Sequence, residues 1–241
     1  MAIFAMSDLH LAISNPDKSM GLFGSAWKDY IPRIKAGFEE NVKDGDTVLM
    51  PGDLSWVMYM KDGYDDFKFI DDLPGHKIIS RGNHDYFWTT VKKMEEQFAS
   101  FGISTIEIAR NNVIEVEGSL ITGTRGWKLP SDTNFNDDDR KIYDREVIRL
   151  GLCMNALNKL DPNHEKRHIC MLHYPPLNNV RKNTEFTSIL EENHVDICIY
   201  GHLHGKAQYR MFEGEQNGVN YKFVSAEYLD FKPLCLDDWV S

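Results

Sequence analysis

The stretch KIISRGNHDYFW, residues 77–88, joins a short apolar run to the adjacent polar residues Asn83, His84 and Asp85. A run of this length between turn residues is typical of a buried strand. Gly82-Asn83 is ordinary turn chemistry, so one interpretation of the polar residues is a turn. The other is a metal site at the strand end, with one side chain on the metal and its neighbour on the substrate. The stretch alone leaves both interpretations open.

Four other apolar runs end in the same way. Each is followed within a few residues by side chains that bind metals: AIFAM by Asp8 and His10, TVLMP by Gly52 and then Asp53, HICML by His173, and DICIY by Gly201 and then His202 and His204. Because the runs are short and bounded by Gly or Pro, we expect buried strands rather than helices. A rigid scaffold commonly collects ligands from several strand ends, so the pattern predicts one shared site.

The segments between these strands carry apolar residues at helical spacing. Four helices are predicted, over residues 32–43, 86–101, 139–160 and 184–193. An amphipathic helix after a buried strand packs its apolar face on the sheet. The alternation of strands and helices therefore indicates an α/β fold.

Two regions of the sequence favour antiparallel strands instead. In residues 103–124, apolar residues either alternate with polar ones or form short continuous runs, on both sides of a turn at residues 110–112. This pattern predicts hairpins. Asn217-Gly218 is a strong hairpin turn signal between two further strand-like segments. We therefore expect mixed sheets. No linker or internal repeat interrupts the pattern, so we expect residues 1–241 to form a single domain.

The composition describes a chain with a large core and an acidic surface. Its 241 residues are 42% hydrophobic, and the formal net charge is -10. An acidic surface repels polyanions, which makes extended nucleic acid an unfavoured partner. The four cysteines form no CxxC pair, so we expect reduced thiols and a cytoplasmic protein. We find no signal-peptide pattern and no apolar run long enough to span a membrane.

The strand ends supply more ligand groups than one tetrahedral ion can bind. The candidate metal ligands are Asp8, His10, Asp53, Asn83, His173, His202 and His204. Such a set suits two ions that share a bridging carboxylate. Imidazole and oxygen ligands without thiolate indicate Mn, Fe, Zn or Co. The number of imidazoles argues against a plain Mg or Ca site, since those ions prefer oxygen ligands.

The order of these motifs resembles that of the calcineurin-like metallophosphoesterases. The family series D-x-H, G-D, G-N-H-D, H and G-H-x-H corresponds here to Asp8 to His10, Gly52-Asp53, Gly82 to Asp85, His173 and Gly201 to His204. The motifs stand in the family order and cover most of the chain. The resemblance implies two mixed β-sheets packed as a sandwich and flanked by helices.

The resemblance also implies a role for each candidate residue. One metal ion would be bound by Asp8, His10 and His204, and the other by Asn83, His173 and His202, with Asp53 bridging the two. His84 would reach the substrate as a general acid. Asp85 would hydrogen-bond His84, fix its orientation and keep it protonated.

The implied activity is dinuclear metal-dependent hydrolysis of a phosphomonoester or a phosphodiester. A metal-bridging hydroxide would attack the phosphorus, and two divalent or trivalent ions would offset the negative charge of the phosphate. Asn83, His84, Arg81 and Arg125 are candidates to contact the substrate. Leu54-Ser55-Trp56 departs from the acidic and basic pair of the eukaryotic protein Ser/Thr phosphatases, which argues against a protein phosphatase.

Two alternatives belong to other functional classes. One is a non-catalytic metal-binding scaffold of the same fold, which an intact His84 and a full ligand set argue against. The other is a nuclease acting on short nucleic acid, which the acidic charge does not oppose. The favoured substrate is a phosphorylated small molecule or a nucleotide.

Overall fold

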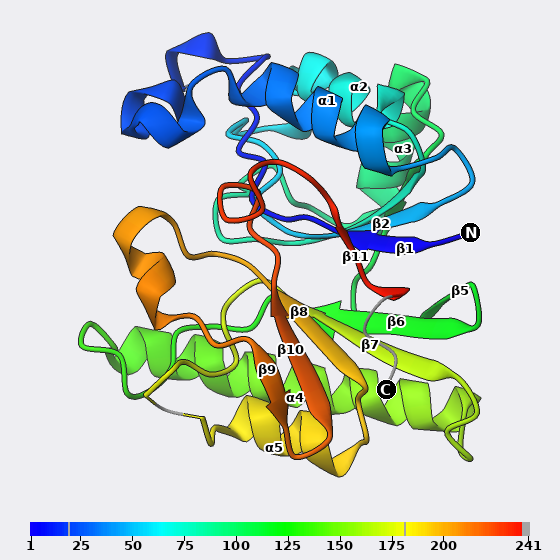
Figure 1. Ribbon diagram of the computed structural model, residues 1–241, viewed down its shortest axis with the longest axis vertical. Coiled ribbons are helices and arrows are strands. Elements are labelled where there is room, and N and C mark those ends of the chain that lie inside the picture. The colour runs from blue at the N-terminus through cyan, green and yellow to red at the C-terminus, as the bar shows by residue number, and fades with distance from the viewer. Residues whose placement is uncertain (19, 181, 238–241) are drawn as a thin grey trace.

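Two β-sheets lie face to face in the computed structural model of the chain, and helices cover the outer face of each sheet (Figure 1). The structure describes residues 1–18, 20–180 and 182–237, with only the backbone of Leu22 and Phe23. The predicted sandwich of two mixed sheets flanked by helices is confirmed.

The first sheet contains five strands in the order β11-β1-β2-β3-β4. Neighbours from β1 to β4 run parallel, and β11 runs antiparallel to β1. The strands are β1 (Ile3–Ala5), β2 (Thr47–Pro51), β3 (His76–Ser80), β4 (Ile106–Ile108) and β11 (Leu234–Cys235). The helices on its outer face are α1 (Tyr30–Asn41), α2 (Tyr64–Asp72) and α3 (Val91–Phe101).

The second sheet contains six strands in the order β5-β6-β7-β8-β10-β9. The inner four are parallel, and β5 and β9 run antiparallel at the two edges. The strands are β5 (Ile114–Val116), β6 (Ser119–Thr124), β7 (Arg167–Leu172), β8 (Ile197–Tyr200), β9 (Gly214–Gln216) and β10 (Val219–Phe223). Its outer face is covered by α4 (Asp137–Leu160) and α5 (Glu185–Glu192).

Short 3-10 helices lie in the connections. They are η1 (Pro16–Lys18), η2 (Met20–Phe23), η3 (Ser25–Trp27), η4 (Met60–Asp62) and η5 (Gly205–Arg210). Among the helices of the described ranges, none has both the length and the apolar character needed to cross a membrane.

The layer between the two sheets is a continuous apolar core. The first sheet contributes Ile3, Leu49 and Ile78, and the second contributes Ile169 and Ile199, all of them fully buried. Separate apolar clusters pack each sheet against its own helices. The inner strands are thus buried on both faces, which is why the sequence shows continuous apolar runs and not alternation.

The helix predicted over residues 86–101 begins later than expected, at Val91. Thr90 caps it by accepting a hydrogen bond from the backbone amide of Lys93. The preceding residues form tight turns instead, with the amide of Tyr86 donating to the carbonyl of His84. Helical spacing of apolar residues continues through these turns, so the pattern alone misplaced the helix start.

The predicted hairpin around residues 110–112 is wrong. This segment leaves β4, which pairs with β3 in the first sheet, and enters β5, which pairs with β6 in the second. The true hairpin joins β5 to β6 through Glu117 and Gly118, both in the left-handed region with φ of 48° and 72°. The hairpin predicted at Asn217-Gly218 is confirmed between β9 and β10.

The two sheets are joined where β1 ends. The amide of Ser7 donates to the carbonyl of Val224 at 2.7 Å, and the amide of Ala226 donates to the carbonyl of Ser7 at 2.9 Å. Val224 directly follows β10, so this pairing draws the end of β1 against the second sheet. The carboxyl ends of both parallel sets therefore meet in one region.

Candidate metal centre

All the predicted metal ligands lie in this region, each just after a strand. They are Asp8 and His10 after β1, Asp53 after β2, Asn83 after β3, His173 after β7, and His202 and His204 after β8. Their side chains form two groups that could each hold a metal ion, and the two groups match the division that the motifs imply.

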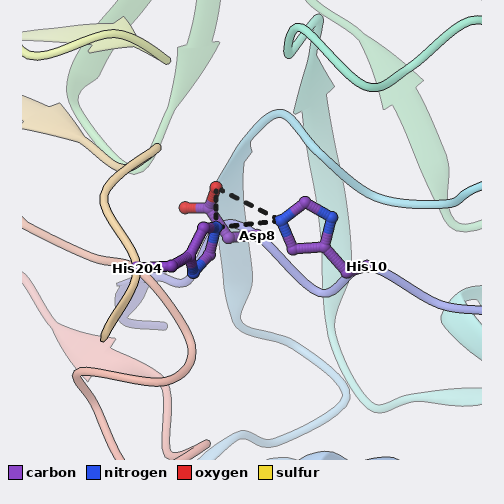
Figure 2. Close-up of side chains that lie close together, drawn as sticks. All are labelled: Asp8, His10 and His204. Atoms are coloured by element: carbon purple, nitrogen blue, oxygen red, sulfur yellow. Dashed lines mark hydrogen bonds and ion pairs between the residues drawn. The ribbon is translucent and has the colours of Figure 1, made fainter. Parts of the chain in front are cut away.

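The first group consists of Asp8, His10 and His204 (Figure 2). The Nε2 atoms of His10 and His204 lie 2.9 Å apart. Oδ1 of Asp8 lies 3.4 Å from Nε2 of His204 and 3.9 Å from Nε2 of His10. Asp8 and His10 come from the first sheet and His204 from the second, so this group forms only when the sheets pack together.

The second group consists of Asp53, His173 and His202, with Asn83 between them. Oδ1 of Asn83 lies 2.8 Å from Nε2 of His173 and 2.8 Å from Nδ1 of His202. Oδ2 of Asp53 lies 3.3 Å from Nε2 of His173. These distances place an amide oxygen, a carboxylate oxygen and two imidazole nitrogens around one point.

Asp53 lies between the two groups. Its Oδ1 accepts a hydrogen bond of 2.8 Å from the amide of His84. Its Oδ2 is buried and accepts no hydrogen bond from the described residues. That oxygen lies 3.3 Å from Nε2 of His173 and 3.7 Å from Nε2 of His10. Asp53 is therefore positioned to contact both groups.

The orientation of His173 tests whether a cation fits here. Its Nδ1 donates to the carbonyl of Pro51 at 2.9 Å, so in the neutral ring the lone pair is on Nε2. That lone pair faces the oxygens of Asn83 and Asp53, which also carry lone pairs. A cation at their centre relieves this repulsion. Oxygen and imidazole donors without thiolate suit Mn, Fe, Zn or Co, so the residues fit two metal ions.

The carboxylates favour positive charge at both groups. Burial opposes protonation of His173, but the charge of Asp53 outweighs it and raises the pKa of His173 to about 9. Burial likewise opposes protonation of His204, and the nearby carboxylates of Asp8 and Glu227 raise its pKa to about 10. Burial opposes ionisation of Asp8, yet His204 lowers its pKa to about 2.

The other two histidines are held neutral. Burial lowers the pKa of His10 to about 4, although Asp53 opposes the shift. Burial and then the charge of His173 lower the pKa of His202 to about 3. A neutral imidazole is the form that binds a metal ion, so burial prepares these two side chains as ligands.

The backbone at the centre adopts an uncommon conformation. Asp8, His10, Asp53 and His202 all have left-handed φ, at 58°, 46°, 54° and 77°. Non-glycine residues rarely adopt this region, and strained positions of this kind cluster at functional sites. At each of these positions the chain turns sharply after a strand, which directs the side chain across the strand ends.

The glycines of two motifs allow the carboxylates to approach the backbone. A Cβ atom on Gly82 would collide with Oδ1 of Asp53, and one on Gly201 would collide with Oδ2 of Asp8. Both contacts would be far closer than 3.0 Å, which no Cβ tolerates. These glycines are therefore required by the positions of the two carboxylates.

His84 lies beside the first group and is partly exposed. Its ring centroid is 5.7 Å from that of His10 and 4.6 Å from that of Trp56. Trp56 also stacks on His10, at 5.1 Å and an interplanar angle of 25°. Trp56 entered the sequence interpretation only as a departure from the protein phosphatases. The structure shows that it packs against both imidazoles.

The predicted hydrogen bond between Asp85 and His84 is not present. The buried carboxylate of Asp85 accepts from the backbone amides of Gly82 at 2.7 Å, Leu54 at 2.8 Å and Asp53 at 2.9 Å. These amides occupy both carboxylate oxygens. Nor is the pKa of His84 raised, because burial lowers it and Asp53 only partly offsets the shift.

Sequence reasoning missed Glu227, which lies behind His204. Its Oε2 is 3.6 Å from Nδ1 of His204 and accepts a 2.9 Å hydrogen bond from the amide of Gly205. A carboxylate behind a ligating histidine orients the ring and raises its basicity. No motif surrounds Glu227, and it lies beyond the last family motif, so the sequence carries no signal for it.

The structure places Arg81 and Arg125 together, lining one small cavity. The guanidinium of Arg125 lies 4.4 Å above the ring of Trp127 and 4.0 Å from Oε1 of Glu146. Whether either arginine contacts a substrate stays a prediction.

The sequence matches the calcineurin-like phosphoesterase family over residues 1–206. No curated protein matches it. Similar folds occur in the protein of unknown function AQ665 from Aquifex aeolicus, with 16% identity, coverage of 98% of this chain and 96% of that one, and a TM-score of 0.51. TT1561 of Thermus thermophilus has 11% identity, coverage of 86% and 85%, and a TM-score of 0.50. The family match covers most of the chain, and the structural matches agree with it in fold: the chain belongs to the calcineurin-like phosphoesterase family.

Proposed function

We propose that the protein is a phosphoesterase that uses two metal ions. The observation that carries the proposal is the position of Asp53. Its Oδ2 is buried without a hydrogen-bond donor among the described residues and lies between His10 of one ligand group and His173 of the other. A carboxylate between two ligand groups is what a pair of ions needs as a bridge.

Each ligand has a definite task in this proposal. Asp8, His10 and His204 would hold one ion, Asn83, His173 and His202 would hold the other, and Asp53 would contact both. When bound, the ions supply positive charge for the phosphoryl oxygens and lower the pKa of water. Glu227 orients His204, and the carbonyl of Pro51 orients His173.

His84 is the proposed general acid, delivering a ring proton to the oxygen of the leaving group. Three features support this role: it is partly exposed, it lies beside the His10 ring, and Trp56 packs against it. Its orientation comes from Trp56 and from its own amide, which donates to Asp53. Asp85 accepts hydrogen bonds from the backbone of the loops after β2 and β3 and not from the His84 ring.

The proposed substrate is a phosphorylated small molecule or a nucleotide. The net charge of -10 opposes long polyanions, and the bound ions would provide the local attraction for one phosphate. We also propose that residues 1–241 form a single domain. The sheets share an apolar core, and the ligand groups draw on both sheets.

The test is to measure metal content and hydrolysis on the same samples. Metal-loaded protein is assayed with p-nitrophenyl phosphate and bis-p-nitrophenyl phosphate, and bound metal is counted by mass spectrometry. Asp53→Asn should lose metal and activity together. The matched control is Asp44→Asn at an exposed position, which should keep both. Two bound ions with no hydrolysis of either ester would favour the non-catalytic scaffold.

A further inference from the structure

A small cavity of about 60 Å³ adjoins the segments that carry the second ligand group, and most of its charged lining residues are positive. Its walls come from the ends of β3, β4 and β6 and from α4. Four arginines line it, namely Arg81, Arg110, Arg125 and Arg149, and the only acidic residue among the described residues of its lining is Glu146. Such a concentration of guanidinium groups stands out in a chain whose net charge is -10.

Glu146 does not satisfy these arginines. One of its carboxylate oxygens, Oε2, accepts a hydrogen bond from the hydroxyl of Thr124. The other, Oε1, accepts from Arg149 at 2.5 Å and lies 4.0 Å from Arg125. This one buried carboxylate thus accepts one hydrogen bond from Arg149 and approaches Arg125 only to 4.0 Å.

Arg81 and Arg110 are exposed, and the remaining guanidinium donors have few acceptors within the described ranges of the protein. Nε of Arg125 is buried and donates to no acceptor among the described residues. Arg81 makes no side-chain hydrogen bond or ion pair within the part of the chain that the structure describes. Arg110 donates from one nitrogen to the carbonyl of Thr89 at 3.0 Å. Positive charges brought this close repel one another unless an anion lies between them.

The cavity adjoins the segments that carry the second ligand group. Arg81 precedes Asn83 by two residues on the loop after β3. The carbonyl of Arg125 accepts from the amides of His173 at 3.0 Å and Tyr174 at 2.9 Å. The cavity and the second ligand group therefore share these two segments of the chain.

We infer that the arginine cavity binds a second phosphate group of the substrate, so that the enzyme acts on phosphoesters that carry another phosphate. The inference rests on the proposed function. Guanidinium groups match phosphate with paired hydrogen bonds. A phosphate group brings a charge of about -1.5 to -2 at neutral pH, which offsets the excess of arginine over Glu146 better than a single carboxylate does.

The test compares bisphosphates with monophosphates of equal length. The substrates are α,ω-alkanediol bisphosphates with chains of increasing length and the matching alkyl monophosphates, and the measurement is release of inorganic phosphate by metal-loaded protein. The bisphosphate should exceed its monophosphate in kcat/KM by about tenfold or more at one chain length. That length reports the separation between the cavity and the metal centre. Equal kcat/KM values throughout the series would overturn the inference.

The variant for this test is Arg110→Gln, and its matched control is Arg145→Gln, an exposed arginine of α4 outside the cavity. Arg110→Gln should lower the ratio of bisphosphate to monophosphate kcat/KM by about tenfold. Arg145→Gln should leave the ratio unchanged. A ratio that does not change in Arg110→Gln contradicts the inference.

A binding measurement separates this inference from the proposed function. Calorimetry with chelator-treated protein and the preferred bisphosphate should show binding that Arg110→Gln weakens by about tenfold and Arg145→Gln preserves. If no ester is hydrolysed, the proposed function fails. The affinity of the metal-free protein for each member of the bisphosphate series then still tests whether the cavity binds phosphate. An affinity that is equal in wild type and Arg110→Gln would overturn this inference.

Discussion

The two carboxylate oxygens of Asp53 have different partners. Oδ1 accepts the amide of His84, and Oδ2 faces His10 and His173. The residue itself is held at a φ of 54°, which costs about 1–3 kcal/mol for a non-glycine residue. The hydrogen bond from its amide to Asp85 helps to hold this conformation. A single side chain thus determines how the two ligand groups meet.

Gly82→Ala should remove metal without changing any ligand. The added Cβ would collide with Oδ1 and with the amide nitrogen of Asp53, so the carboxylate must move. Metal content counted by mass spectrometry should fall in this variant. Gly151→Ala is the control, because its Cβ would meet nothing within 4 Å. Full metal content in Gly82→Ala would show that Asp53 does not depend on this close approach.

The His84→Ala variant should keep both ions, and its rate of hydrolysis should fall most for esters with a poor leaving group. An alkyl ester needs a proton on its leaving oxygen, whereas p-nitrophenolate leaves without one. The rate on an alkyl phosphate should fall by roughly 10²–10⁴, and the rate on p-nitrophenyl phosphate should fall much less. Steady-state kinetics on both esters checks this. Equal losses on the two esters would argue against a general acid.

The loops after β2 and β3 form one unit because of Asp85. Its carboxylate accepts amides from Asp53 and Leu54 of the first loop and from Gly82 of the second. Burial and then the charge of Asp53 raise the pKa of Asp85 to about 7, and the hydrogen bonds to Gly82 and Leu54 oppose the shift. The family motif places this aspartate beside the proposed acid His84, but its side chain accepts hydrogen bonds from the backbone of the two loops that carry candidate ligands.

Asp85→Ala should therefore act on stability and metal binding. Loss of the shared acceptor leaves three buried amides unsatisfied, and the free energy of unfolding should drop by about 3 kcal/mol. Chemical denaturation and metal titration measure the two effects, with His84→Ala as the comparison. A variant with unchanged stability and metal affinity but a reduced rate would restore the predicted role of Asp85 in orienting His84.

At the scale of the whole molecule, the candidate metal ligands come from both sheets. Asp8, His10 and Asp53 follow strands of the first sheet, and His173 and His204 follow strands of the second. Ions bound at such a junction stabilise the folded state, since the unfolded chain does not assemble the ligands. Removal of metal with a chelator should lower the melting temperature, and added metal should restore it.

The stabilisation by metal should grow as the pH rises from about 7 to about 10. In the metal-free protein, His173 and His204 have pKa values of about 9 and about 10, above the value of 6.5 in the unfolded chain. Their protonation therefore stabilises the fold at low pH, and this contribution is lost as the pH rises through those values. Metal-bound imidazoles lack that proton and lose nothing. Melting curves of both forms check this, and a difference that stays constant with pH would contradict it.

The sequence by itself determined the positions of most strands and the set of candidate metal ligands, and its resemblance to a known family implied the sandwich. The strands and the candidate ligands depend on local signals, since a short apolar run predicts a buried strand and the residue after it lies at the sheet edge. The motif at Gly82 to Asp85 even contains the glycine that Asp53 needs. These features can be predicted from the sequence because the direction of a strand fixes where the residues that follow it lie.

The tertiary structure alone decided which distant groups meet. Asp85 bonds backbone amides and not His84, Glu227 lies behind His204, and four arginines and Glu146 line one cavity. The tertiary structure also sent β4 and β5 into different sheets, although the turn between them resembles a hairpin turn. Such contacts join residues that lie far apart along the chain. Their partners are chosen by packing and burial, which no local pattern of residue types records.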